Sequence, residues 1–149
     1  MTDLQDLYQE LILDHGRRPR NFGRLEDANK TAEGYNPLCG DKIRVYVRVA
    51  GDLVEDIKFE GAGCAISTAS ASIMTDALKG KSRAESEQLF KAFHDLVTGQ
   101  QPGPDTPDLG KLEVFSGVSE FPTRVKCATL SWHTLRSALS GEGEAVSTE

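Results

Sequence analysis

Three cysteines are the side chains of this sequence best suited to chemistry, and an acidic residue lies close to one of them. Cys39, Cys64 and Cys127 are the only cysteines, and Asp41 comes two residues after Cys39. Three thiolates and one carboxylate make a possible four-coordinate site for a metal ion. Because an odd number of cysteines cannot all pair within one chain, the alternative is buried, unreactive thiols in a reducing compartment.

The neighbours of each cysteine fit a reactive or metal-binding thiolate. Cys64 follows two glycines at the expected start of a helix, where exposed amides and the helix dipole favour the thiolate and predict a lowered pKa. Cys39 lies in a loop between a proline and a glycine, and Cys127 follows the basic residues Arg124 and Lys126. The separations are too long for a zinc finger, so spacing alone leaves open a shared metal site or scattered structural thiols.

The elements that must position these residues are predicted from hydrophobic periodicity and from capping signals. In the first half of the chain we expect a helix over 3–15, a loop with a short edge strand near 31–35, and a hairpin over 42–59 with a bulge or frayed start at Glu55. A helix over 64–79 follows, and then a helix that begins at the capping box of Ser82 and Glu85. The last elements expected are a short helical insert over 109–115 and a helix from Pro122 to about 139.

These elements predict an α+β fold. An antiparallel hairpin with one apolar face requires helices on that face, so we expect a small antiparallel sheet of about three strands with helices packed on one side. All three cysteines fall at the starts of elements, which predicts that the metal site lies at one end of the fold. Residues 1–140 are expected to form one domain, and the small, acidic residues 141–149 a disordered tail.

Composition excludes several classes of function. The formal net charge of −6 argues against general nucleic-acid binding, since no excess of Lys and Arg is available to displace counterions. No signal peptide and no apolar run of about 20 residues is present, so we expect a cytoplasmic protein without a membrane span. No glycine-rich phosphate loop or Ser/His/Asp arrangement is found, so a stand-alone catalyst is not predicted.

Several stretches resemble the IscU/NifU N-terminal-domain family of iron–sulfur cluster assembly proteins, and nearly the whole chain takes part. They are Asp14-His15, Pro19-Arg20-Asn21-Phe22-Gly23, Asn36-Pro37-Leu38-Cys39-Gly40-Asp41 and Phe59-Glu60-Gly61-Ala62-Gly63-Cys64-Ala65-Ile66-Ser67. The IscU branch of this family has a histidine directly before the third cysteine, where this chain has Lys126. The lysine at this position and an insertion over about 99–121 are both similar to features of the SufU branch.

The resemblance implies a tetrahedral zinc site made by Cys39, Asp41, Cys64 and Cys127. It further implies that a pyridoxal-phosphate cysteine desulfurase of the SufS type donates persulfide sulfur, and that downstream iron–sulfur assembly proteins receive it. Cys39 is the expected acceptor because its glycine-flanked loop can move, while Asp41 would hold the metal. One alternative is a scaffold that assembles a [2Fe–2S] cluster, or holds iron, at the same residues. A further alternative is a structural zinc domain that only binds partners.

Charged residues near these motifs have expected supporting roles. Arg124 and Lys126 are candidates for offsetting the negative charge of the ligands, although a solvated helix start explains them equally well. Arg17, Arg18 and Arg20 are candidates for docking an acidic partner surface, with a solvated loop as the alternative. None of the histidines, which are His15, His94 and His133, occupies the ligand position, and the last two are expected in surface or packing roles.

Overall fold

The computed structural model of this protein describes residues 4–37, 40–100, 107, 109–140 and 146–147. Its elements, in chain order, are helix α1 (Leu4–Arg17), strands β1 (Lys30–Asn36), β2 (Asp41–Ala50) and β3 (Leu53–Ala62), helices α2 (Ala65–Leu78) and α3 (Arg83–Val97), the 3-10 helix η1 (Gly110–Glu120), helix α4 (Pro122–Ser140) and strand β4 (Val146–Ser147).

The sheet has the strand order β3-β2-β1-β4. β1 pairs with β2 and β2 with β3, both antiparallel, which confirms the predicted sheet. The pairing of β2 with β3 shifts register after Arg48, so Glu55 is the extra residue of a bulge, one of the two outcomes expected for it. The short strand β4 pairs parallel with β1 and was not predicted.

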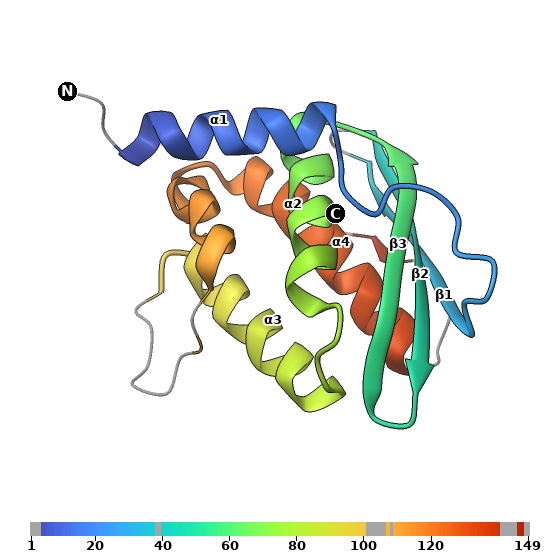
Figure 1. Ribbon diagram of the computed structural model, residues 1–149. Helices are drawn as coiled ribbons and strands as arrows, with labels where there is room; N and C mark the ends of the chain where they lie inside the picture. Colours follow the sequence, from blue (N-terminus) through green and yellow to red (C-terminus); the bar gives the residue numbers. More distant parts are fainter. Residues whose placement is uncertain (1–3, 38–39, 101–106, 108, 141–145, 148–149) are drawn as a thin grey trace.

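Helices cover one face of the sheet, as the alternation of apolar and polar residues in β2 requires (Figure 1). Ile43, Val45 and Val47 point into the core, and Lys42, Arg44 and Arg48 are exposed. Phe93 and Trp132, from α3 and α4, stack with ring centroids 4.7 Å apart in the middle of the helical layer. The predicted α+β architecture is therefore confirmed.

Close contact between α4 and the sheet depends on a glycine. A Cβ added at Gly34 would lie 2.0 Å from Thr134 Oγ1 and 3.1 Å from Leu130 Cδ1. Only a residue without a side chain therefore lets α4 pack directly on β1. This packing places the N-terminal end of α4 at the same end of the fold as that of α2 (Figure 1).

Two boundaries differ from the sequence predictions. α1 continues through Gly16 to Arg17, because Gly16 packs against Ala65, whose Cβ is 3.3 Å from the position a Cβ on Gly16 would take. Val146–Ser147 belong to the sheet, while the rest of 141–149 lies outside the described residues, so its disorder remains a prediction. No helix in the described part of the chain is long and apolar enough to cross a membrane.

Candidate metal centre

Three of the four predicted ligands converge at one end of the fold. One donor atom each from Asp41, Cys64 and Cys127 lies within 4.8 Å of the other two. Asp41 begins β2, Cys64 directly precedes α2, and Cys127 lies in the second turn of α4. Three elements distant in sequence thus bring their donors together. Cys39, the fourth predicted ligand, lies outside the described residues.

Cys64 and Asp41 are joined by direct hydrogen bonds. The Cys64 backbone N–H donates to Asp41 Oδ1 at 2.8 Å, and the Cys64 thiol donates to Asp41 Oδ2 at 3.6 Å. Cys64 is also the N-cap of α2, where its sulfur accepts from the Ser67 backbone N–H at 3.4 Å. The predicted position of Cys64 at a helix N-terminus is confirmed.

Two glycines make the approach of Cys64 to Asp41 possible. A Cβ at Gly63 would lie 2.5 Å from Asp41 Oδ1, so a larger residue would displace the carboxylate. Gly61 has a φ of +152°, and a Cβ there would lie 2.1 Å from the Lys42 carbonyl oxygen. The Gly-Ala-Gly sequence before Cys64 therefore shapes the site as well as the turn.

Cys127 is fixed by residues for which the sequence predicted no role at the metal centre. The buried Asn36 side chain donates from Nδ2 to Cys127 Sγ at 3.6 Å. The Ser70 hydroxyl on α2 donates to the Ala128 carbonyl at 2.5 Å, and Trp132 Nε1 donates to Ser70 Oγ at 3.2 Å. Hydrogen bonds between α2 and α4 thus set the separation of the helices that carry Cys64 and Cys127.

The donor set fits a zinc ion. Asp41 is fully buried, and none of the ion pairs found among the described residues involves it. A buried carboxylate without a cationic partner is costly, and a metal ion would supply the missing positive charge. Thiolates on tetrahedral zinc lie about 3.8 Å apart, given Zn–S bonds near 2.3 Å, which is compatible with the donor separations here.

The acidity of Cys64 differs from the prediction made from sequence. Burial raises the pKa of the Cys64 thiol, the Ser67 backbone N–H opposes this rise, and the Asp41 carboxylate adds to it. The sequence shows the helix N-terminus but not the burial, so the expected lowering was wrong for the protein chain by itself. A bound cation would favour the thiolate by direct coordination.

The segment that contains Cys39 is closed at its base next to Cys127. The Gly40 backbone N–H donates to the Asn36 carbonyl at 2.8 Å, which holds the two ends of the segment together. Gly40 has a φ of +72°, a conformation that favours glycine. Since the Asn36 side chain also contacts Cys127, the segment begins and ends beside the other ligands.

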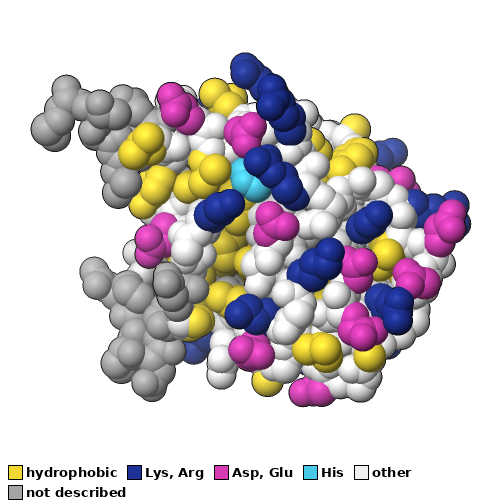
Figure 2. All heavy atoms as spheres, in the orientation of Figure 1, with side chains coloured by type: hydrophobic (Ala, Val, Ile, Leu, Met, Phe, Trp, Pro, Cys, Tyr) yellow, Lys and Arg dark blue, Asp and Glu magenta, His cyan; other side chains and the backbone are white. Residues whose placement is uncertain are grey.

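The basic residues with predicted supporting roles lie in two places, near the start of α4 and around the end of α1. Arg124 is exposed and its guanidinium lies 4.6 Å from the centroid of the Phe121 ring, while Lys126 is half-buried. Their charge-offsetting role remains a prediction. Arg17 and Arg18 are exposed at the end of α1, where Figure 2 shows basic side chains gathered with acidic ones between them. Arg20 forms an ion pair with Asp14 at 2.8 Å.

The three histidines have packing roles in the structure. His15 is fully buried, with Nδ1 2.6 Å from Ser72 Oγ. His94 and His133 both lie against the ring of Phe90, at centroid distances of 6.3 and 5.3 Å. The packing role expected for His94 and His133 is therefore what the structure shows.

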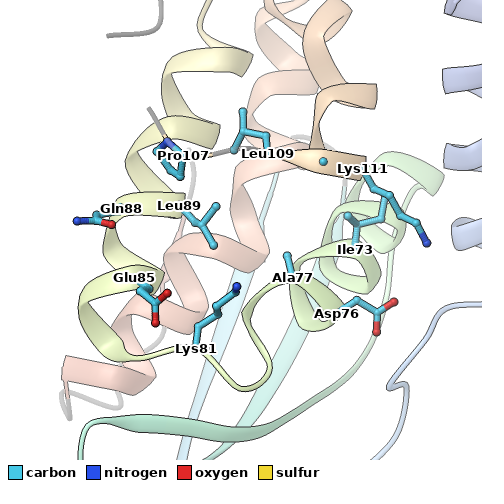
Figure 3. A pocket seen from close by; sticks show the side chains of 11 residues that line it. Ile73, Asp76, Ala77, Lys81, Glu85, Gln88, Leu89, Pro107, Leu109 and Lys111 are labelled. Atoms are coloured by element: carbon cyan, nitrogen blue, oxygen red, sulfur yellow. The ribbon is translucent and has the colours of Figure 1, made fainter. Parts of the chain in front are cut away.

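A pocket of about 500 Å³ lies between α2, α3 and η1, separate from the metal centre (Figure 3). Ala77, Leu89 and Leu109 form apolar walls, and the side chain of Lys81 points into the space between them. The α2 residues that line the pocket begin nine residues after Cys64, which corresponds to roughly 14 Å along a helix.

Comparison with known proteins places this architecture in a family. The profile of the NifU-like N-terminal domain matches residues 7–128. The chain is 47% identical over 141 residues to the zinc-dependent sulfurtransferase SufU of Bacillus subtilis, covering 95% of each protein. It is 42% identical over 145 residues to the iron–sulfur cluster assembly scaffold protein IscU of Streptococcus pyogenes, covering 97% of this chain and 90% of that one.

A solved structure has the same fold over nearly the full length. It is a crystal structure from Fervidobacterium islandicum AW-1, assigned to the SUF system as an iron–sulfur cluster assembly scaffold. The TM-score is 0.82 at 36% identity, with coverage of 92% of this chain and 99% of the other. This protein therefore belongs to the NifU-like N-terminal domain family, alongside the SufU and IscU proteins to which it is similar.

Proposed function

We propose that this protein is an iron–sulfur cluster assembly protein that accepts sulfur from a pyridoxal-phosphate cysteine desulfurase while zinc holds its thiolates. The observation that carries this proposal is the convergence of Asp41, Cys64 and Cys127 within 4.8 Å, with the carboxylate fully buried. The similarity to a SufU protein named as a zinc-dependent sulfurtransferase supports the same function.

Cys39, Asp41, Cys64 and Cys127 would hold the metal. When bound, zinc keeps the thiolates deprotonated and protects them from oxidation without taking part in redox chemistry. Asp41 is anchored by the Cys64 N–H and by its position at the start of β2, so it remains in place if a cysteine leaves the site. This arrangement suits a site in which one ligand is exchanged.

Cys39 is the proposed acceptor. Its thiolate attacks the outer sulfur of the desulfurase persulfide, the sulfur–sulfur bond breaks, and the desulfurase cysteine leaves as a thiolate. Cys39 then carries the transferred sulfur as a persulfide, and no external oxidant or reductant is needed. Cys64 and Cys127 are less suited to this step because hydrogen bonds already hold their sulfur atoms. The Ser67 backbone N–H donates to the Cys64 sulfur, and the Asn36 side chain donates to that of Cys127.

Three exposed arginines are the proposed docking residues for the desulfurase: Arg17 at the end of α1, and Arg18 and Arg20 directly after it. The packing of Gly16 on Ala65 places Arg17 and Arg18 next to the start of α2, and so near Cys64. Arg20 forms an ion pair with Asp14, which orders the side chain while leaving it 41% exposed. Exposed charges of this kind contribute to the association rate, which then decreases with increasing ionic strength.

The second candidate function is a scaffold on which a [2Fe–2S] cluster is assembled at the same ligands. The relatives named as IscU scaffolds favour it, because one of them is 42% identical over nearly the full chain. Lys126, which stands where the IscU branch has a histidine, favours sulfur transfer instead. A purely structural zinc domain agrees less well with a proposed ligand, Cys39, that directly precedes a glycine in the sequence.

A desulfurase assay tests the proposal. Sulfide or alanine production by a SufS-type desulfurase is measured with wild-type protein, with Cys39→Ala, and after zinc has been removed by a chelator. We expect the wild type to stimulate the desulfurase, and both the variant and the zinc-free protein to lose this stimulation. Full stimulation by Cys39→Ala would contradict its role as acceptor. An iron-containing, coloured protein without zinc would favour the scaffold.

A further inference from the structure

Asn21 links β3 to α2, the two elements on either side of Cys64 in the chain, through both its backbone and its side chain. Its φ of +57° lies in the left-handed region, which asparagine tolerates better than other residues with side chains. Its carbonyl accepts a hydrogen bond from the Phe59 N–H at 3.0 Å. Its side-chain amide donates to Thr75 Oγ1 and to Asp76 Oδ1, both at 3.0 Å. One residue therefore joins β3 to α2.

Residues around Asn21 reinforce this link. The Gly23 N–H donates to the Phe59 carbonyl at 2.7 Å, and the Phe22 ring packs edge-on against the Phe59 ring at 5.3 Å between centroids. The Arg20 N–H donates to Ser72 Oγ at 2.8 Å. The loop after α1 is thus bonded to β3 on one side and to α2 on the other.

The distances of these bonds from Cys64 determine how the link between β3 and α2 affects the metal centre. Phe59 lies in β3, five residues before Cys64, which follows the end of the strand. Five residues of extended chain span roughly 16 Å. Thr75 lies eleven residues after Cys64 along α2, also roughly 16 Å in a helix. β3 and α2 are therefore two arms of similar length that meet near Cys64, and Asn21 connects them away from that point.

We propose that Asn21 is a positioning residue for the metal centre. By fixing the angle between β3 and α2, it holds the turn over 61–64 in the conformation that brings the Cys64 N–H to Asp41. This inference rests on the metal centre of the proposed function and not on sulfur transfer. Asn21 touches none of the ligands in the described part of the structure and acts on them through the two elements it joins.

Asn21→Gly tests this proposal with Asn29→Gly as a matched control. Glycine accommodates the positive φ of residue 21, so the variant removes the side-chain bonds without adding backbone strain. Asn29 also forms two side-chain bonds, with the Val49 carbonyl at 2.7 Å and the Val49 N–H at 2.9 Å. Val49 is near the end of β2 opposite to Asp41, so the control loses similar bonds far from the site.

Two measurements are made on each variant. The first is hydrogen exchange of the Cys64 amide with a chelator present, and the second is zinc affinity by competition with a chromophoric chelator. We expect Asn21→Gly to speed up exchange at Cys64 and to weaken zinc binding by roughly 2- to 30-fold, the range in which residues without ligand contact modulate a distant site. Asn29→Gly should leave both at wild-type values. Equal effects of the two variants, or none, would overturn the proposal.

A second route keeps the test valid if Asn21→Gly does not fold. The double variant Thr75→Val and Asp76→Ala removes both acceptors on α2 and leaves the backbone of Asn21 unchanged. It should shift exchange at Cys64 and zinc affinity in the same direction, and unchanged values contradict the proposal. If wild-type protein binds no zinc, the proposed metal centre fails, whereas exchange at the Cys64 amide still tests Asn21.

Discussion

The Cys64 backbone N–H donates to the Asp41 carboxylate at 2.8 Å, so two predicted metal ligands are joined through the protein itself. The bond connects the start of β2 to the residue that precedes α2. It orients one Asp41 oxygen and leaves the other directed toward the Cys64 sulfur. Asp41 is therefore suited to keep its position while another ligand is exchanged.

Gly63→Ala is expected to weaken metal binding. The added Cβ would lie 2.5 Å from Asp41 Oδ1, so the carboxylate or the turn must shift away from the donors. Gly117→Ala is the matched control, because a Cβ there meets no atom within 4 Å. Competition with a chromophoric chelator should show at least about tenfold weaker zinc binding for Gly63→Ala only. Equal affinities of the two variants would show that the contact does not shape the site.

Gly34→Ala is expected to destabilise the fold through the contact of β1 with α4. Its Cβ would lie 2.0 Å from Thr134 Oγ1, and overpacking of this kind costs about 1–3 kcal/mol. Urea denaturation measures the loss. Thr134→Ala in the same chain removes the hydroxyl and should restore part of the stability. If the double variant is as unstable as the sum of the two single variants, the clash with Thr134 is not the cause.

Stability is expected to decrease in mild acid because His15 is buried. Burial lowers the pKa of His15, so the native state binds this proton less readily than the unfolded chain does. The contribution of His15 to the free energy of unfolding is complete above the pKa of histidine in the unfolded chain, about 6.5. It is lost as the pH falls below that pKa, until the native imidazole protonates as well. Nearby charges also act on this pKa: Arg20 and Lys111 lower it, and Asp14 and Asp76 raise it.

Denaturation at several pH values, with a chelator present, measures this dependence. His15→Gln should flatten the slope between about pH 6.5 and 5, although it also loses native packing. Burial lowers the pKa of His133 too, so His133→Gln serves as the comparison. This variant should remove only the part of the pH dependence of stability that is due to His133. A slope that His15→Gln leaves unchanged would rule out His15 as its source.

Zinc is expected to stabilise the native state. A ligand that binds only the folded protein, present at 1,000 times its dissociation constant, adds about 4 kcal/mol to the free energy of unfolding. Thermal unfolding with added zinc and with a chelator measures this change. Cys127→Ser should abolish most of the difference, because the buried Cys127 is a proposed ligand. A melting temperature that does not respond to zinc in the wild type would contradict the metal centre.

Much of the fold could be predicted because local patterns and tertiary structure agree. The alternation in β2 gave its buried face, and the capping box of Ser82 and Glu85 is formed as predicted at the start of α3. Glu55 interrupts an apolar face in the sequence and is the bulge residue in the structure. Each of these signals lies within a few neighbouring residues, where sequence is most informative.

The supporting contacts of the site could not be predicted, because they join residues far apart in the chain. Asn36 reaches Cys127 across 91 positions, and Trp132 reaches Ser70 across 62. The pKa direction of Cys64 depends on burial that only the packed structure shows. Asn36 stands in one of the motifs that resemble the family, but nothing in the local sequence indicates that its side chain contacts Cys127 or that Ser70 joins α2 to α4.

The most direct test of the account is to locate the transferred sulfur. Zinc-loaded protein is mixed with a cysteine desulfurase and cysteine, free thiols and persulfides are alkylated, and the peptides are analysed by mass spectrometry. We predict that the peptide containing Cys39 gains the mass of one sulfur atom, and that those containing Cys64 and Cys127 do not. A gain confined to Cys64 or Cys127, or no gain on any cysteine under turnover, would contradict the account.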